Sequence, residues 1–328
     1  KFIALIAITL SMAACEKEYL DTAPTDQVDA GAAFLTTTNA WAALNGIHRA
    51  MYVRYNSQGE YGQPAVMINT DMLGEDLVMT AVGNGWYNNT YKWIDHRNEN
   101  SGLTRFIYEF YYRLIGNANL IIANIDNADG PQEDRNAIKG QALAYRGWAH
   151  FNLVQFYGKR YQAGTTNSQP GVPLMLTPTT EGQARATVEE VYAQVNKDLD
   201  DAMALLTENR PAKSHFNINV VQGIKARVAL TQQNWTVAAQ MAENARKGYT
   251  LMSNADYLSG FNDVKNAEWI WGLDHIDDQT TFFASFHAYI SANFNSTNIR
   301  TNPKAINKLI YDQMSETDVR RACWLPAP

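Results

Sequence analysis

The stretch GQALAYRGWAHFNLVQFYG, residues 140–158, decides the fold, because it reads as a long helix that is apolar on two sides. Along residues 135–157 apolar side chains recur every three or four positions, as a helical turn of 3.6 residues requires. This first stripe consists of Ile138, Ala142, Tyr145, Ala149, Leu153 and Phe156, and a second one consists of Ala144, Trp148 and Phe151. A helix with two apolar sides is expected to lie between neighbouring helices.

Three further segments, 36–54, 105–126 and 187–206, show the same helical period. Their stripes are Ala40, Leu44, Ile47 and Met51; then Phe106, Phe110, Leu114, Ala118, Ile121 and Ile125; then Val188, Val191, Val195, Leu199, Ala202 and Leu206. The third helix opens with Thr187-Val188-Glu189-Glu190, a capping box in which hydroxyl and carboxylate satisfy free backbone N–H groups. Its acidic residues Asp198, Asp200 and Asp201 are predicted to form a solvated face.

Residues 219–247 form the most diagnostic pair of helices. Small and aromatic residues stand at the positions typical of a tetratricopeptide repeat, where they let antiparallel helices approach closely: Ala226, Ala229, Trp235, Ala238, Ala242 and Ala245. Trp235 is predicted to fill the turn, Asn234 to cap the second helix, and Gln233 replaces the usual glycine. Any helical hairpin with alanine at its contact remains the alternative. Several such hairpins would build a curved scaffold.

Long irregular segments separate the helices at about 56–104, 158–186 and 272–300. They are rich in aromatic residues, Asn and Gly, and loops of this length in a compact domain usually serve a function or are disordered. The composition favours order. The predicted fold is therefore mostly α, with tetratricopeptide-like helical hairpins forming a curved scaffold, long aromatic-rich loops and minor β-hairpins.

Composition limits the functions that the chain can have. Its 328 residues are 46% apolar and 18% charged, with a net charge of −6, which suits a folded domain and excludes a disordered chain. An acidic chain without clustered Lys and Arg is not built to bind nucleic acid. Two cysteines, Cys15 and Cys323, cannot make a disulfide framework, and Cys323 is predicted to be buried or incidental.

The first residues read as a targeting segment. Residues 2–14 carry no charge, yet they are too few to cross a bilayer core, which takes roughly 20 helical residues. They end in Ser11-Met12-Ala13-Ala14-Cys15, where small residues before a cysteine form the cut site of a bacterial lipoprotein signal. An ordinary secretory signal with a coincidental cysteine is the alternative. We therefore predict a signal peptide at 1–14, a tether at 15–30 lipidated on Cys15, and one helical-repeat domain at 31–328.

An ordered set of motifs resembles the SusD/RagB-type outer-membrane lipoproteins. The signal followed by EYLDTAP at 18–24 resembles the start of that family, and residues 140–158 are similar to its long central helix. GVPL at 171–174 and ATVEEVY at 186–192 follow in the family's order. Further on, Glu268-Trp269-Ile270-Trp271 resembles a short strand and Asp318-Val319-Arg320-Arg321 a later motif. Family members continue past this point, so part of the C-terminal domain is expected to be missing.

The resemblance implies a function. Such a protein would be a non-catalytic lipoprotein on the outer surface of a Bacteroidetes-type bacterium, held in the outer membrane by its lipid. It would cover a SusC-like TonB-dependent outer-membrane barrel and capture oligosaccharides or, in the RagB-like branch, peptides for import. No cofactor, metal or nucleic-acid partner is implied.

The first irregular segment supplies the chemistry that sugar binding needs. Trp and Tyr stack on the apolar faces of a sugar ring, while Asn bonds its hydroxyl rim. Trp86, Tyr87, Asn88, Asn89 and Trp93 provide these groups close together, and Trp86 lies where Gly and Asn favour an exposed loop tip.

The resemblance places the ligand between this region and loops after the last repeat, which adds Phe282, Phe283 and Tyr289 as candidates. The alternative is that Tyr91 and Trp93 pack beneath their own loop or face the barrel partner.

Enzymatic functions find little support. The sequence lacks a Gly-x-Ser-x-Gly elbow, a His-Glu-x-x-His motif, a phosphate loop and a Cys-x-x-Cys pair. Its histidines show no metal-ligand spacing, and His150 is predicted to be a hydrogen-bonded core or interface residue. Asp71, Glu75 and Asp76 could be imagined as an acid/base pair but more often cap turns. The competing hypotheses are a helical-repeat scaffold lipoprotein for envelope assembly without a small ligand, and a secreted glycan hydrolase.

Overall fold

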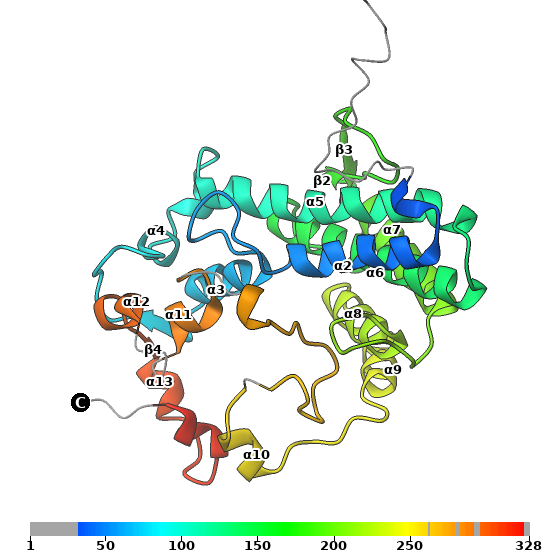
Figure 1. Cartoon of the computed structure of the whole chain (residues 1–328). Helices are drawn as coiled ribbons and strands as arrows, with labels where there is room; N and C mark the ends of the chain where they lie inside the picture. The colour runs from blue at the N-terminus through cyan, green and yellow to red at the C-terminus, as the bar shows by residue number, and fades with distance from the viewer. Residues whose placement is uncertain (1–31, 262, 280–282, 292–295, 325–328) are drawn as a thin grey trace, which may run out of the picture.

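The computed structural model describes residues 32–261, 263–279, 283–291 and 296–324, and helices dominate it (Figure 1). Each long helix packs on the next one along the chain, as the hydrophobic stripes predict. In chain order these helices are α5 (Gly102–Asn124), α6 (Gln132–Tyr157), α7 (Val188–Leu205), α8 (Ile218–Thr231) and α9 (Trp235–Ala245). An earlier helix, α2 (Thr37–Ala50), packs on α5 and α6.

Helix α6 occupies the centre, between α5 and α7. Both of its predicted stripes are buried apart from the half-buried Phe156, and Ala142, Ala149 and Leu153 have no exposed surface. Burying a leucine side chain contributes about 1.5–3 kcal/mol, so these stripes hold the bundle together. The close approach of α7 needs glycine at position 140, where a Cβ would lie 2.7 Å from Leu206 Cγ. The sandwiched central helix is thus confirmed.

The side chains that were predicted to cap helix N-termini do so. The Thr187 hydroxyl accepts from Glu190 N, and the Glu190 carboxylate accepts from Thr187 N, which completes the capping box of α7. Asn234 caps α9 by accepting from Val237 N. Gln233 adopts a left-handed φ of 60°, the conformation that the usual glycine of this turn would take without strain.

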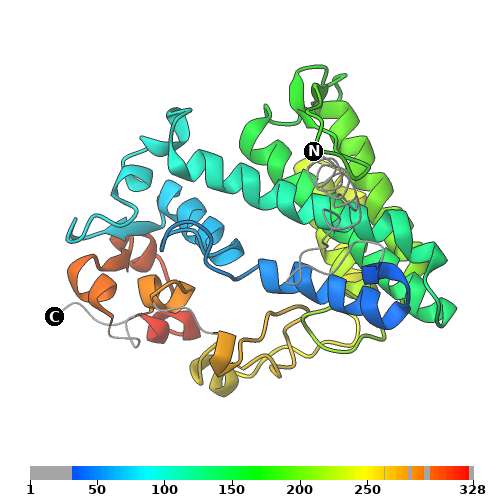
Figure 2. The same ribbon diagram turned by 45° about the horizontal axis from the view of Figure 1, so that its top comes forward.

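A second lobe joins segments that lie far apart in the sequence (Figure 2). Strand β1 (Leu77–Met79) pairs antiparallel with β4 (Lys304–Ile306), with Leu77 opposite Ile306. The helices of this lobe are α3 (Gln63–Leu73), α4 (Asn88–Tyr91), α11 (Phe286–Ile290), α12 (Thr297–Thr301) and α13 (Lys308–Tyr311). The first irregular segment and the end of the chain therefore fold together.

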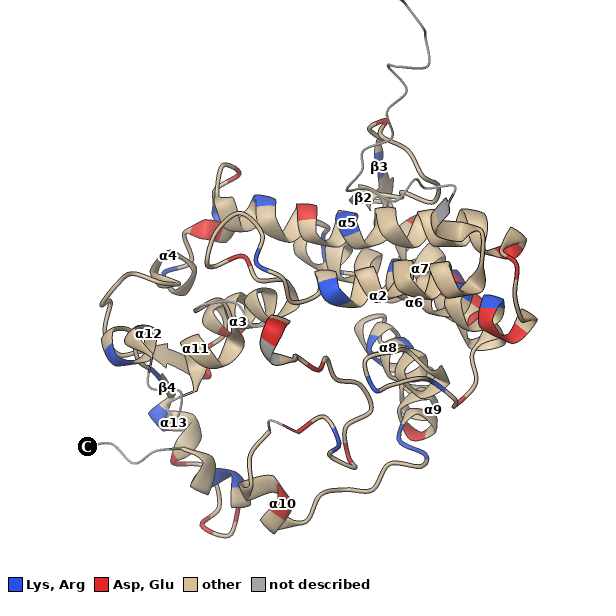
Figure 3. Ribbon diagram, viewed as in Figure 1, with Lys and Arg blue, Asp and Glu red and all other residues tan. Residues whose placement is uncertain are grey.

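The remaining elements are short. Strands β2 (Pro170–Pro173) and β3 (Arg185–Thr187) form an antiparallel hairpin beside α5, and α10 (Asn254–Leu258) lies between the two lobes (Figure 1). Five 3-10 turns complete the described chain: η2 (Ala32–Phe34), η3 (Asp95–Arg97), η4 (Ile125–Asn127), η5 (Asp277–Gln279) and η7 (Val319–Cys323). Acidic and basic residues are interspersed over both lobes (Figure 3).

Several local predictions were wrong. The segment 56–104 contains the 11-residue helix α3, which begins at Gln63 and has Pro at its first turn. Residues 268–271 form turns and bends instead of a strand. Trp235 does not fill the turn of its hairpin and is 62% exposed, because backbone bonds close that turn, from Asn234 N to Ala229 O and from Gln233 N to Leu230 O. Cys323 is exposed.

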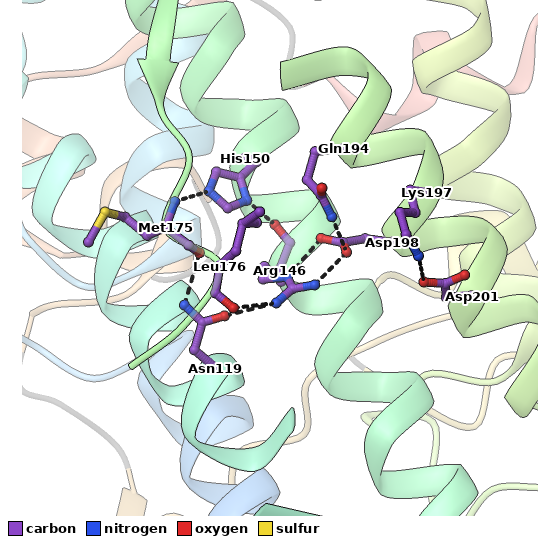
Figure 4. Close-up of polar contacts among 9 residues, drawn as sticks. All are labelled: Asn119, Arg146, His150, Met175, Leu176, Gln194, Lys197, Asp198 and Asp201. Atoms are coloured by element: carbon purple, nitrogen blue, oxygen red, sulfur yellow. Dashed lines mark hydrogen bonds and ion pairs between the residues drawn. The ribbon is translucent and has the colours of Figure 1, made fainter. Parts of the chain in front are cut away.

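Asp198 does not belong to a solvated face, because its side chain is fully buried (Figure 4). It accepts from the Arg146 guanidinium twice, from Nη2 at 2.7 Å and from Nε at 2.9 Å, and once from Gln194 Nε2 at 2.8 Å. Position 198 stands three residues after Val195 and four before Ala202, so it falls on the stripe that faces α6. The prediction of exposure holds for Asp200 and Asp201, whose side chains are 57% and 44% exposed.

Candidate functional site

A cavity of about 270 Å³ opens where the 57–60 turn, the segment 85–95 and the first turns of α5 meet. Four of the residues predicted for the site line it together: Trp86, Tyr87, Asn88 and Asn89. Because α4 begins at Asn88, the two asparagines stand on the first turn of that helix, directly after the indole of Trp86. The cavity thus combines an aromatic ring with side-chain amides, and ligand binding by these residues stays a prediction.

Trp86 is half-buried, and its ring is fixed from two sides. A Cβ at position 59 would lie 3.2 Å from Trp86 Cζ3, so glycine there lets the 57–60 turn reach the indole. On another side the ring of Tyr289 meets the indole edge-to-face, with centroids 5.6 Å apart at 70°. A ring held in this way loses little conformational entropy when a ligand stacks on it.

Three tyrosines form the layer that supports Trp86. Tyr289 stacks on Tyr61 with centroids 5.7 Å apart and meets Tyr87 edge-to-face at 5.2 Å. The hydroxyls of Tyr61 and Tyr87 share a hydrogen bond of 2.9 Å. Burial raises the pKa of Tyr289 to about 12, and it raises the pKa values of Tyr61 and Tyr87 further. These phenols are therefore neutral and serve as rigid support.

One cation touches this tyrosine layer. Lys304 Nζ lies 5.4 Å from the Tyr87 ring centroid and donates to Asn302 O at 2.9 Å. Burial lowers the pKa of Lys304 to about 8. Lys304 belongs to β4, so the strand pairing with β1 brings this ammonium group behind the cavity.

Carboxylates and amides provide hydrogen-bond acceptors around the cavity. Glu60 and Asp95 both line it, and Asp95 is oriented by the hydroxyls of Thr90 at 2.9 Å and Ser101 at 3.2 Å. Among the described residues no donor bonds the buried side-chain oxygen of Asn88. A ligand rich in hydroxyl groups would supply a donor to Asn88 and further donors to the remaining lone pairs of the two carboxylates.

The other predicted site residues lie elsewhere. Trp93 is off the cavity wall and 50% exposed, with its indole edge-on to His96 at 5.6 Å. Tyr289 is fully buried behind Trp86, so its place is in the supporting layer, and the half-buried Phe283 does not line the cavity. Phe282 and the predicted lipidation residue Cys15 lie outside the described residues.

Sequence reasoning missed the part of the wall that other segments contribute. Glu60 follows the glycine turn at 59, while Asn69 comes from α3 and Phe106 from α5. Asn69 accepts from the Thr90 hydroxyl at 3.0 Å, which ties α3 to α4. The sequence signal for this part of the wall was the Gly59-Glu60 pair, which lies in an aromatic-rich loop. Phe106 could not be recognised as a wall residue, because its helical spacing assigns it to the core.

Within the described residues, no cluster of three or more His, Cys, Asp or Glu is arranged to hold a metal ion. No helix in these ranges has the length and apolarity to cross a membrane. As predicted, His150 is a core residue, and its Nδ1 lies 3.1 Å from Arg146 O. None of Asp71, Glu75 and Asp76 lines the cavity.

Residues 18–230 match the SusD-like family described as starch-binding and associating with the outer membrane. The chain belongs to this family. A SusD-like carbohydrate-binding protein from Bacteroides vulgatus is 29% identical, with a TM-score of 0.75 over 88% of this chain and 60% of that protein. A SusD superfamily protein from Bacteroides thetaiotaomicron is 22% identical, with a TM-score of 0.74 over 88% and 64%.

A laminarin-binding SusD-like protein matches more distantly, at 19% identity and a TM-score of 0.55 over 68% of this chain and 48% of that one. None of the curated proteins matches the chain. The chain spans 60% and 64% of the length of the two Bacteroides proteins.

Proposed function

We propose that this protein is a non-catalytic lipoprotein that captures an oligosaccharide in the cavity beside Trp86 and delivers it to a TonB-dependent outer-membrane barrel. The observation that carries the proposal is the cavity of about 270 Å³, in which one fixed indole faces a rim of amides and carboxylates. Membership of a family described as starch-binding supports a glycan over a peptide.

The chemistry of a sugar ring explains why this wall suits it. The C–H face of the ring stacks on an indole, while its hydroxyls donate to acceptors at the edge. Trp86 offers the ring, and Asn88, Glu60 and Asp95 offer acceptors. A peptide would also bring N–H donors for these acceptors, so the preference for a glycan rests on the indole and on the family description.

Delivery rests on the predicted lipid anchor. Acylation of Cys15 would tether the domain to the outer membrane, where the SusC-like barrel is the expected partner. Several acyl chains on one cysteine hold a protein firmly at a bilayer, whereas a single chain binds only marginally. Co-purification of a large β-barrel with the lipidated protein would support this step.

Calorimetric titration tests capture. The mature chain carrying Cys15→Ser is titrated with maltoheptaose, laminarihexaose and peptides of similar length. We expect at least one saccharide to bind without being cleaved and Trp86→Ala to weaken that binding by about 1–2 kcal/mol. The control is Trp235→Ala, which changes an exposed tryptophan that does not line the cavity and should leave the affinity unchanged.

The outcome separates this function from its competitors. Peptide binding without saccharide binding would overturn the glycan assignment. Failure of every ligand to bind would favour a scaffold role in envelope assembly, and release of shortened saccharides would reveal a hydrolase.

A further inference from the structure

A second cavity lies farther along α5, between this helix and the loop that connects β2 to β3. Its volume is about 330 Å³, and its walls come from the middle of α5 and from residues 173–183. Leu103 of the first cavity and Gly116 of the second are separated on the helix by about 20 Å, taking the usual rise of about 1.5 Å per residue. One rigid helix therefore contributes to both cavities.

Two tyrosines of α5, whose rings are tilted against each other, form one wall. Tyr108 is 37% exposed, and its ring centroid lies 4.6 Å from that of Tyr112. The Tyr112 hydroxyl donates to Pro173 O at 2.8 Å, and Tyr157 meets Tyr108 edge-to-face at 5.3 Å. Fixed aromatic rings with an accessible face are what a sugar ring stacks on.

Gly116 keeps the floor of the cavity open. It lies inside α5, where glycine is among the poorest helix formers. No atom lies within 4 Å of the place where its Cβ would be, so packing between helices does not explain the glycine. A larger side chain at this position would instead occupy the cavity.

The opposite wall is held by buried polar groups (Figure 4). Asn119 Nδ2 donates to Met175 O at 2.9 Å and to Thr177 O at 3.3 Å. Arg146 Nη1 donates to Leu176 O at 3.0 Å and to Asn119 Oδ1 at 3.1 Å. Because the Arg146–Asp198 ion pair anchors this network, the backbone of the wall is fixed before any ligand arrives.

Beyond the fixed backbone the wall ends in exposed polar side chains. Thr177, Thr179, Thr180 and Gln183 carry hydroxyl and amide groups that both donate and accept hydrogen bonds. The cavity thus pairs an apolar ring with a polar rim, which is the same division as in the cavity beside Trp86.

We propose that this cavity is a second saccharide-binding site, in which Tyr108 stacks on one sugar ring and the 177–183 loop bonds its hydroxyls. The proposal rests on the proposed function for the class of ligand. With both sites on α5, the protein would hold two saccharides, or one long chain at two points.

Variants of Gly116 and Tyr108 test the second site. The mature chain carrying Cys15→Ser is titrated with maltoheptaose and laminarihexaose at millimolar concentration, with and without Trp86→Ala. Gly116→Phe fills the cavity and Tyr108→Ala removes the aromatic ring. Trp235→Ala, which truncates an aromatic residue that lines neither cavity, is the control. Thermal unfolding confirms that each variant is folded, and Tyr108→Ala carries the test if Gly116→Phe does not fold.

We expect two molecules of saccharide per chain in the wild type and one in Gly116→Phe, while Trp86→Ala weakens the first site and leaves the second unchanged. Tyr108→Ala should weaken the second site by about fivefold, which corresponds to ~1 kcal/mol, and Trp235→Ala should leave both sites intact. A single site that Trp86→Ala weakens and that Gly116→Phe and Tyr108→Ala leave unchanged would overturn this inference while the proposed function stands. Absence of all saccharide binding would overturn both.

Discussion

Replacing Asp198 by asparagine should destabilise the fold far more than the same replacement at Asp201, three residues along α7. Asp198 is fully buried and accepts two bonds from Arg146, whereas Asp201 is 44% exposed and pairs with Lys197 on its own helix. Asp198→Asn leaves the Arg146 guanidinium buried without a counter-charge, and such a loss costs about 3–5 kcal/mol. An exposed pair within one helix contributes about 0.3–0.5 kcal/mol, which sets the expected cost of Asp201→Asn.

Urea unfolding followed by circular dichroism measures both changes, with the two variants serving as each other's control. The transition midpoint of Asp198→Asn should fall while the slope with denaturant stays close to the wild type. A third variant, Arg146→Met with Asp198→Leu, removes both charges and should lose less stability than Asp198→Asn alone. If Asp198→Asn and Asp201→Asn differ by less than about 0.5 kcal/mol, within the range of ordinary surface substitutions, the burial of this ion pair does not control stability and the reasoning fails.

Three further predictions concern a turn, a titration and the anchor. Gln233→Gly should stabilise the fold by about 1 kcal/mol, because the left-handed φ of 60° strains a residue with a Cβ, and a lower midpoint in urea would contradict this. Burial lowers the pKa of His150 from 6.5 to about 3, so below pH 6.5 only the unfolded chain takes up this proton. Stability should therefore fall by about 1.4 kcal/mol per pH unit between pH 6.5 and 3 from this residue, and His150→Asn should flatten the measured slope by that amount. Cys15→Ser should prevent incorporation of labelled fatty acid and release the protein from membranes, and a variant that stays membrane-bound would disprove the anchor.

The helical part of the fold could be predicted because its stripes are local. Ala142, Ala149 and Leu153 lie on one side of a single helix, and spacing alone places them inside. Asp198 shows where this reasoning stops: its buried position follows from Val195 and Ala202, yet its partner Arg146 lies 52 residues earlier and has no local signature. A charged residue in an acidic run was therefore assigned to the surface.

Some residues of the candidate site could likewise be predicted from the sequence and others could not. Trp86, Asn88 and Asn89 are neighbours in the sequence, so their combination of an aromatic ring with amides was recognisable there. Asn69 and Asp95 both bond Thr90 in this wall, and that contact depends on how α3 and α4 pack. Tyr289 was predicted to bind the ligand, and its burial behind Trp86 depends on tertiary packing that no pattern of spacing encodes.

The pairing of β1 with β4 has a consequence for how the protein matures. Asn84 and Asn298, which hydrogen-bond at 2.8 Å beside this pairing, are 214 residues apart in the sequence. During synthesis the helical hairpins can assemble from neighbouring segments, whereas the loop that carries Trp86 must wait for Tyr289 and Lys304 to emerge. In a nascent chain the helical hairpins would thus form first and the cavity beside Trp86 last.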